Sequence, residues 1–275
     1  MKLKKKYSYN NKRQIFRLIP TDTGKIIIEE RDTEMKLAYF NCLHIDSGKK
    51  IFKHLQLDEK FWLGIEAIYN DVIFFHKFVK PDLPQHNGII AYDINNKQTI
   101  WEDKNRSFLF VKDEKIYAFQ QRFEDREFVT LNYLTGEVID ELGIDSNAIN
   151  LLREDAINSE DFSSYRFPGS FGANSFVEQR ENEILSKLRE EHIITGGIEY
   201  VLMDDLLLFN FHEVNSGNTL KNIFKAIDLS RGKYIIEVTL NSRTNAFAPD
   251  SFFVKDDLLF LLIERTKLEV YKIKN

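Results

Sequence analysis

The sequence predicts an all-β protein, a β-propeller of about five four-stranded blades, with six as the alternative count. Short apolar strands joined by polar turns recur along most of the 275 residues. Units of four such strands repeat at roughly 40 to 50 residues, a period typical of propeller blades. Hydrophobic residues make up 43% of the chain and aromatic residues 13%, which suits a folded, strand-rich domain. We therefore expect a single domain over residues 1–275.

Five successive units account for the strands. In each unit a short polar turn joins the first two strands, a looser loop follows, and a second polar turn joins the last two. The strands are expected at 15–20, 25–31, 37–45 and 50–55; at 63–69, 72–79 and both halves of 88–101; at 107–111, 115–122, 128–133 and 137–141; at 199–203, 206–212, 224–229 and 233–240; and at 251–254, 258–264 and 268–273.

The turns keep the same residue types from one unit to the next. Acidic residues or Asn fill the first turn, and one Asp or Asn precedes the turn between the third and fourth strands. The first-turn pairs are Asn70-Asp71, Asp113-Glu114, Asp204-Asp205 and Asp256-Asp257, and the residues before the later turn are Asp46, Asp93, Asn132 and Asp228. This shared register indicates true repetition of one structural unit.

The last unit ends without a fourth strand. Residues 5–10 (KKYSYN) precede the first unit and alternate in polarity, so they are predicted to supply the outer strand of the last blade. Closure of this kind protects an edge strand that would otherwise invite mispairing. The alternative is that residues 5–10 form a tail outside the fold.

One copy of the repeat is similar to the repeat of a known class of propeller. AYDINNKQTIW, residues 91–101, resembles the repeat of quinoprotein-type propellers, in which an Asp precedes a turn and a Trp follows it. Together, Trp62-Leu-Gly64, PDLPQHNG at 81–88 and the segment 88–101 are similar to an uncharacterised bacterial family known only as a domain of unknown function. That family implies no activity. The sequence contains no recognisable quinone-binding motif, so we expect no cofactor.

Residues 144–197 interrupt the repeat between the third and fourth blades. Residues 147–157 and 175–192 have apolar positions at helical spacing, and residues 159–174 between them are predicted as a loop. We therefore expect a partly helical insertion on the loop face of the propeller. Within it, Arg153, Tyr165 and Arg166 are candidate binding residues for an anionic ligand or a protein partner. The alternative is that these side chains only hold the insertion to the blades.

Two histidines flank a proline-containing segment of the second unit. His76 and His86 would converge if their strands pair, with Asp82 between them in the chain. Two His and one Asp can bind a transition metal, but Pro81 and Pro84 already account for residues 80–87 as a rigid crossover loop. We expect His76, Asp82 and His86 to bind a ligand, without a metal.

Three carboxylates lie near the predicted starts of innermost strands, where they would surround the channel mouth. These are Glu66, Glu199 and Asp250. Paired carboxylates carry out glycoside hydrolysis, so the three are candidate catalytic residues; the alternative is solvated charges at the rim. Cys42 is the only cysteine, lies in an apolar strand and is expected to be a buried thiol.

Composition limits the classes of partner. The formal charge of −5 without a basic face argues against nucleic acid. No apolar run approaches the roughly 18 residues that span a bilayer, and the lone cysteine favours a reducing compartment, so we expect a cytoplasmic protein. The leading hypothesis is a non-enzymatic binding or scaffold protein with an unknown protein or small-molecule partner. The alternatives are a carbohydrate-active hydrolase and a degenerate propeller with only a structural role.

Overall fold

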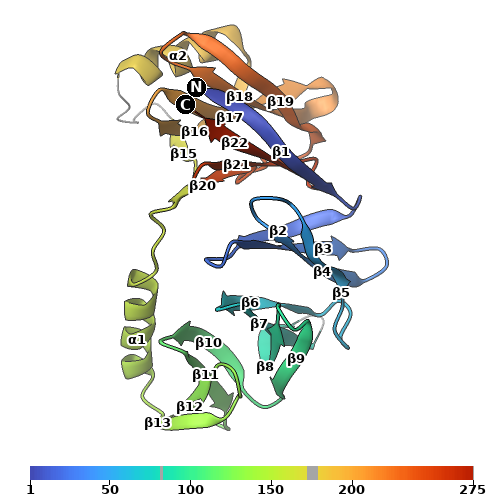
Figure 1. The fold of residues 1–275 in the computed structure, drawn as a ribbon, viewed down its shortest axis with the longest axis vertical. Coiled ribbons are helices and arrows are strands. Elements are labelled where there is room, and N and C mark those ends of the chain that lie inside the picture. Colours follow the sequence, from blue (N-terminus) through green and yellow to red (C-terminus); the bar gives the residue numbers. More distant parts are fainter. Residues whose placement is uncertain (81–82, 172–178, 275) are drawn as a thin grey trace. The chain divides into compact units, whose positions relative to one another are not determined.

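The structure is a computed structural model that describes residues 1–80, 83–171 and 179–274. The fold is all-β and is built of antiparallel sheets (Figure 1). The chain divides into two compact units, and each is described by itself. Unit 1 comprises Met1–Gln14, Asp46–Gly48 and Phe162–Asn275, and unit 2 comprises Ile15–Ile45 and Lys49–Asp161.

Unit 2 contains three four-stranded sheets, each with its strands side by side in chain order. The strands are β2 (Gln14–Pro20), β3 (Lys25–Asp32), β4 (Leu37–His44) and β5 (Lys50–Leu55); β6 (Leu63–Tyr69), β7 (Val72–Lys80), β8 (Leu83–Asp93) and β9 (Gln98–Asp103); and β10 (Ser107–Lys112), β11 (Lys115–Gln121), β12 (Arg126–Asn132) and β13 (Val138–Gly143). The first three repeat units therefore form the sheets that the sequence predicts.

Unit 1 contains two sheets, each with one short additional strand at an edge. The first sheet has the order β15 (Gly169–Phe171), β16 (Ile194–Met203), β17 (Leu206–Asn215), β18 (Thr219–Asp228) and β19 (Lys233–Thr244), with a 3-10 turn, η1, at Ser216–Asn218. The second has the order β1 (Lys2–Asn10), β22 (Lys267–Lys274), β21 (Leu258–Ile263), β20 (Phe252–Lys255) and β14 (Tyr165–Arg166).

The first and last strands of the chain pair with each other. β1 lies antiparallel to β22, with Lys5 opposite Tyr271 and Asn10 opposite Lys267. The prediction that residues 5–10 complete the last four-stranded unit is confirmed. The pairing begins earlier than predicted, at Lys2 opposite Lys274.

The repeated turns have the geometry that their residues favour. Asn70-Asp71 and Asp113-Glu114 both have two positive φ angles, as a type I′ hairpin turn requires. In the later turn, the side chain of the preceding residue accepts hydrogen bonds from the backbone N–H groups two and three positions on. Asp93, Asn132 and Asp228 all do this, at 2.7 to 3.3 Å. The same side-chain cap therefore shapes the turn in three different sheets.

Neighbouring sheets within each unit bury apolar faces against one another. In unit 2, Phe40 of β4 meets Phe75 of β7 edge-on, with ring centroids 4.8 Å apart. Trp101 of β9 donates from Nε1 to the carbonyl of Tyr133, in the turn after β12, at 3.0 Å. In unit 1, Phe224 of β18 meets Phe252 of β20 at 5.0 Å. Burial on both faces explains the continuous apolar runs in these strands.

The segment 144–197 is not one helical body. Helix α1 (Ser146–Asn158) starts after Asp145, whose Oδ1 accepts from the N–H groups of Asn147 and Ala148, and it packs onto the β10–β13 sheet of unit 2. Helix α2 (Gln179–Glu191) buries Leu185 and Leu188 against the β15–β19 sheet of unit 1. None of the described helices is long and apolar enough to cross a membrane.

Two segments expected to be irregular are strands. β14 and β15 lie within residues predicted as a loop, and each adds an edge strand to a sheet of unit 1. The predicted crossover at 80–87 is wrong as well, because β7 continues to Lys80 and β8 begins at Leu83. Backbone pairing across this long hairpin prevails over the local signal of Pro84, which is tolerated near the start of a strand.

Candidate functional site

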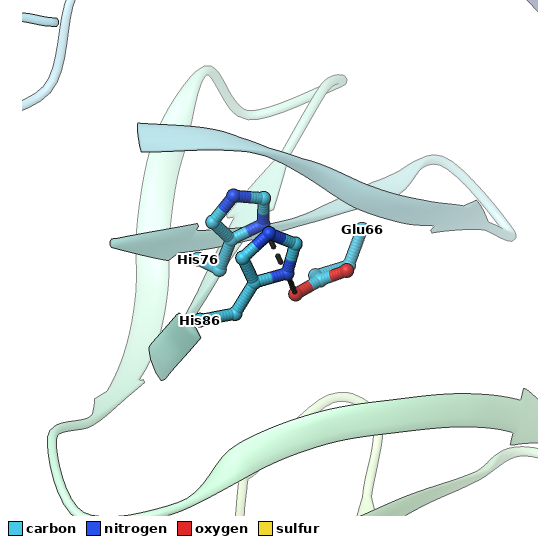
Figure 2. Close-up of side chains that lie close together, drawn as sticks. All are labelled: Glu66, His76 and His86. Atoms are coloured by element: carbon cyan, nitrogen blue, oxygen red, sulfur yellow. Dashed lines mark hydrogen bonds and ion pairs between the residues drawn. The ribbon is translucent and has the colours of Figure 1, made fainter. Parts of the chain in front are cut away.

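A cluster of Glu66, His76 and His86, hereafter the His–Glu cluster, lies in the β6–β9 sheet of unit 2. Three adjacent strands supply one residue each: β6 carries Glu66, β7 carries His76 and β8 carries His86 (Figure 2). The long β7–β8 hairpin brings the two histidines side by side, with His86 opposite Phe78 in the backbone register.

Two β-bulges direct these side chains. Glu66 is an extra residue on β6, between the pairs Ile65–Phe75 and Ala67–Phe74. On β8, two residues face His76 alone, and one of them is Gly88, with a φ of 76°. A bulge with glycine in this left-handed conformation is a recognised way to re-aim neighbouring side chains. The bulges therefore place Glu66 and the two imidazoles together.

One carboxylate oxygen faces both imidazoles. Glu66 Oε1 lies 2.8 Å from His86 Nδ1, a hydrogen bond, and 3.0 Å from His76 Nδ1. The two rings stack with centroids 3.5 Å apart and planes 7° apart, as Figure 2 shows. Phe78 stands edge-on to both rings, at 5.0 Å from His76 and 5.2 Å from His86.

His76 is the buried member of the cluster, with 3% of its surface exposed. Neither of its ring nitrogens has a hydrogen-bond partner among the described residues, since the contact with Glu66 lacks hydrogen-bond geometry. Behind its ring, a Cβ on Gly64 would lie 2.8 Å from His76 Cε1 and 3.2 Å from Arg17 Nη2. The absence of a side chain at residue 64 therefore makes room for His76.

Buried charges anchor the backbone behind the cluster. The Glu29 side chain is fully buried and accepts from Arg17 Nε at 3.0 Å and from Arg31 Nε at 2.8 Å. Arg17 Nη1 also donates to the carbonyl of Ile65 at 3.1 Å, next to Glu66. Ion pairing of this kind offsets the desolvation cost of a buried carboxylate. Here the same arginine side chains also connect β2 and β3 to β6.

The environment shifts the pKa of Glu66. Burial raises the pKa of this carboxyl group, but the close contact with His76 and the charge of that ring, and then the charge and hydrogen bond of His86, outweigh burial. The net effect is a pKa below the ordinary value. Glu66 therefore favours the carboxylate form, which is the form that accepts hydrogen bonds or binds a cation.

His86 connects the cluster to a groove. Its side chain is 39% exposed, and its carbonyl accepts from Ser107 Oγ at 2.9 Å. The groove has a volume of about 580 Å³. Arg126 stands over the ring of Phe119, 4.6 Å from its centroid. The lining residues are Pro84, Gln85, His86, Ser107, Phe108, Phe119, Gln121 and Arg126.

The structure thus unites three of the predicted site residues. His76 and His86 were expected to converge if their strands paired, and they do. Glu66 was expected near a channel mouth as a candidate catalytic carboxylate, and in the structure it contacts these two histidines. Asp82, the third member of the predicted binding set, lies outside the described residues.

The other two candidate carboxylates lie in unit 1. Burial raises the pKa of Glu199; a hydrogen bond from Asn210 lowers it, the charge of Asp250 raises it further, and the net pKa is above the ordinary value. Glu199 Oε2 is buried and has no hydrogen-bond partner among the residues that the structure describes. Asp250 is exposed and has a φ of 54°.

The predicted binding residues of the insertion are divided between the units. Arg153 is exposed on α1 of unit 2. Tyr165 and Arg166 form β14 of unit 1, where Arg166 Nη1 donates to the carbonyls of Ser163 and Tyr165 at 2.6 and 2.9 Å. Lys255 Nζ lies 4.1 Å from the centroid of the Tyr165 ring. The contact between Tyr165 and Lys255 fits the alternative in which Tyr165 holds the segment to the sheet, whereas the hydrogen bonds of Arg166 stay within its own segment.

The sequence did not single out the groove residues Ser107, Phe119 and Arg126. They lie on β10, β11 and β12, and only the packing of that sheet beside β8 brings them to His86. One local signal was present, because His86 follows His76 by ten positions and two prolines lie between them. That spacing is compatible with a hairpin that sets the two histidines opposite each other.

Comparisons with known proteins find one matching family model, which describes no activity. The family described as "Domain of unknown function (DUF4905)" matches residues 19–101, which include Glu66, His76 and His86. This confirms the predicted similarity to an uncharacterised family. No curated protein matches the chain. Among solved structures, a europium-containing methanol dehydrogenase aligns at 12% identity with a TM-score of 0.33, over 96% of this chain and 52% of its own. The chain spans about half the length of that protein.

Proposed function

We propose that this chain is a non-enzymatic binding protein that holds a small organic anion in the groove beside His86. The observation that carries the proposal is the guanidinium of Arg126 over the ring of Phe119 inside a groove of about 580 Å³. Sites for small molecules typically have volumes of roughly 300 to 1,000 Å³ and combine apolar walls with a few polar groups. The groove has both features.

The lining supports an anion with a planar apolar part. Phe108 and Phe119 supply aromatic surface, and Gln85 and Gln121 supply amide groups. Arg126 donates from Nε to Gln121 Oε1 at 3.3 Å. Its terminal amino groups have no partner within the described part of the chain, so they can pair with a carboxylate of the ligand.

Titration with simple carboxylates tests this proposal. The probes are benzoate, 4-hydroxybenzoate and hexanoate, with benzamide as the uncharged comparison, and binding is followed by NMR of the labelled protein. We expect the aromatic carboxylates to bind best and the Arg126→Gln variant to bind them about tenfold or more weakly. Arg122→Gln is the control, since Arg122 is exposed and pairs with Glu127.

Two results would contradict the proposal. Equal affinity in the Arg126 and Arg122 variants would place the anion elsewhere. No binding of any carboxylate by the folded protein would leave the degenerate propeller, with only a structural role, as the better hypothesis.

We also propose that the five sheets are the blades of one propeller, closed by β1, with the segment 144–197 on its loop face. The support is the repeated four-strand order and the pairing of β1 with β22. Small-angle scattering tests the closure, because a compact chain of this length has a radius of gyration of about 19 Å. A clearly larger value would show that the ring is open.

A second candidate function is glycoside hydrolysis in unit 1. Glu199, with its raised pKa, would be the acid, and Asp250 would be the second carboxylate. Hydrolysis of a panel of nitrophenyl glycosides that is lost in Glu199→Gln and kept in the exposed control Glu237→Gln would support it. No turnover of the panel would exclude this function for those sugars.

A cytoplasmic location completes the proposal. Its support is the single cysteine, Cys42, whose side chain is buried and free and cannot form an intrachain disulfide. Fractionation of the native cell tests the location, and recovery of the protein outside the cytoplasm would contradict it.

A further inference from the structure

We propose that Glu66, His76 and His86 bind one divalent transition metal ion. The inference does not depend on the ligand of the groove, and it departs from the expectation drawn from the sequence. The side chains offer two imidazole nitrogens and one carboxylate oxygen, and these atoms all lie within 4.8 Å of one another. Two His with one carboxylate is a donor set that Zn²⁺ and related ions use, with positions left open for a further ligand.

The buried nitrogen of His76 points to a ligand. Its Nδ1 is 3.0 Å from Glu66 Oε1 yet makes no hydrogen bond, and its ring is almost fully buried. A buried polar atom without a partner costs on the order of 1 to 3 kcal/mol, and such atoms are uncommon in folded proteins. A cation between Glu66 and His76 would give this nitrogen its partner.

The surrounding residues restrain part of the site in advance. His76 is confined by Gly64 on one side and by the edge-on ring of Phe78 on the other. Glu66 sits at a bulge whose neighbouring carbonyl, that of Ile65, is held by Arg17. Restraint of the groups around the ligands is typical of metal sites, because it fixes the direction of each donor.

His86 has to move for all three residues to share one ion. An imidazole binds a metal at about 2.0 to 2.1 Å and close to its ring plane, whereas the two rings here are parallel with centroids 3.5 Å apart. One ion cannot lie in both planes. Because His86 is the more exposed ring and borders the groove, we infer that it rotates out of the stack when the metal binds.

Titration of the metal-stripped protein with Co²⁺ and Zn²⁺ tests the inference. Visible absorption of Co²⁺ reports the coordination geometry, and calorimetry with Zn²⁺ reports stoichiometry and affinity. We expect one ion per chain, and a loss of affinity of at least about tenfold in His86→Ala and in Glu66→Gln. NMR of the histidine rings should show the His86 signals shifting on addition of Zn²⁺.

The control is His44→Ala, which removes an exposed histidine at the end of β4 in the same unit. This variant should bind both ions as the unaltered protein does. His76 is buried, so its replacement changes the packed interior of the sheet. The decisive variants are therefore those at residues 66 and 86, with folding checked by circular dichroism. Failure of the unaltered protein to bind either ion at micromolar concentration would overturn the proposal. So would equal weakening by His44→Ala and His86→Ala.

Discussion

At the scale of single residues, Gly64 determines whether the His–Glu cluster can form. We predict that Gly64→Ala destabilises the protein by about 1 to 3 kcal/mol, because the added methyl group overpacks the site. That Cβ would lie 2.8 Å from His76 Cε1 and 3.0 Å from His76 Nε2. Urea unfolding measures the effect, and the His76 ring signals in NMR should shift.

Gly169→Ala is the matched control, because nothing lies within 4 Å of a Cβ at that position. It should change the free energy of unfolding by less than about 0.5 kcal/mol. Similar effects of the two substitutions would mean that the space around residue 64 is not limiting.

Cys42 illustrates the effect of burial on a single thiol. Its side chain is fully buried in β4, and burial raises its pKa to about 12, with the charges of Lys25 and Asp71 making smaller, opposing contributions. We predict that a thiol reagent such as Ellman's reagent leaves Cys42 unmodified in the native protein and reacts fully in denaturant, because the thiolate is the reactive form. Rapid labelling of the native protein would contradict the burial.

At the scale of elements, Trp101 joins two sheets of unit 2. Its indole donates to the Tyr133 carbonyl and packs against Gly136, where a Cβ would be only 2.7 Å away. We predict that Trp101→Ala costs about 3 kcal/mol, the lower end of the usual range, because the indole is only partly buried. Urea unfolding provides the measurement. Trp101→Phe should recover part of the loss, whereas a cost below about 1 kcal/mol would place the indole outside the inter-sheet core.

At the scale of the whole chain, Glu269 links its first and last strands. The carboxylate accepts from Lys5 Nζ at 2.6 Å and from the Tyr271 hydroxyl at 2.6 Å, and it also pairs with Lys267. Burial raises the pKa of Glu269, but these three partners outweigh burial and lower it to about 2. The depressed pKa means that the folded state prefers the charged carboxylate.

This pairing predicts a pH dependence with a definite sign. A carboxyl group whose pKa is depressed in the folded state stabilises the protein above its ordinary pKa, near 4.5, and loses this contribution as the pH falls towards 2. Between about pH 6 and about pH 3, the unaltered protein should lose about 1 to 3 kcal/mol more stability than Glu269→Gln. The control is Glu237→Gln, which replaces an exposed carboxyl group. This variant should lose as much stability over the same pH range as the unaltered protein. Equal pH slopes for the unaltered protein and Glu269→Gln would contradict the assignment.

Much of the secondary structure was predictable because hairpin signals are local. Asn70-Asp71 and Asp113-Glu114 favour turns with positive φ, and Asp93 caps its own turn, so a short window of sequence contains the information. The pairing of β1 with β22 was predictable from the missing last strand. The predicted crossover at 80–87 was wrong because backbone pairing across the hairpin outweighed the proline signal.

The sequence by itself therefore determined the repeated four-strand units, their turns and the closing strand. The tertiary structure decided the site. Side chains alternate along a regular strand, but bulges at Glu66 and at Gly88 shift that alternation by one residue and turn the Glu66 and His76 side chains to a common point. A bulge depends on pairing with a neighbouring strand, so residue types and spacing alone could not place Glu66 against His76 and His86.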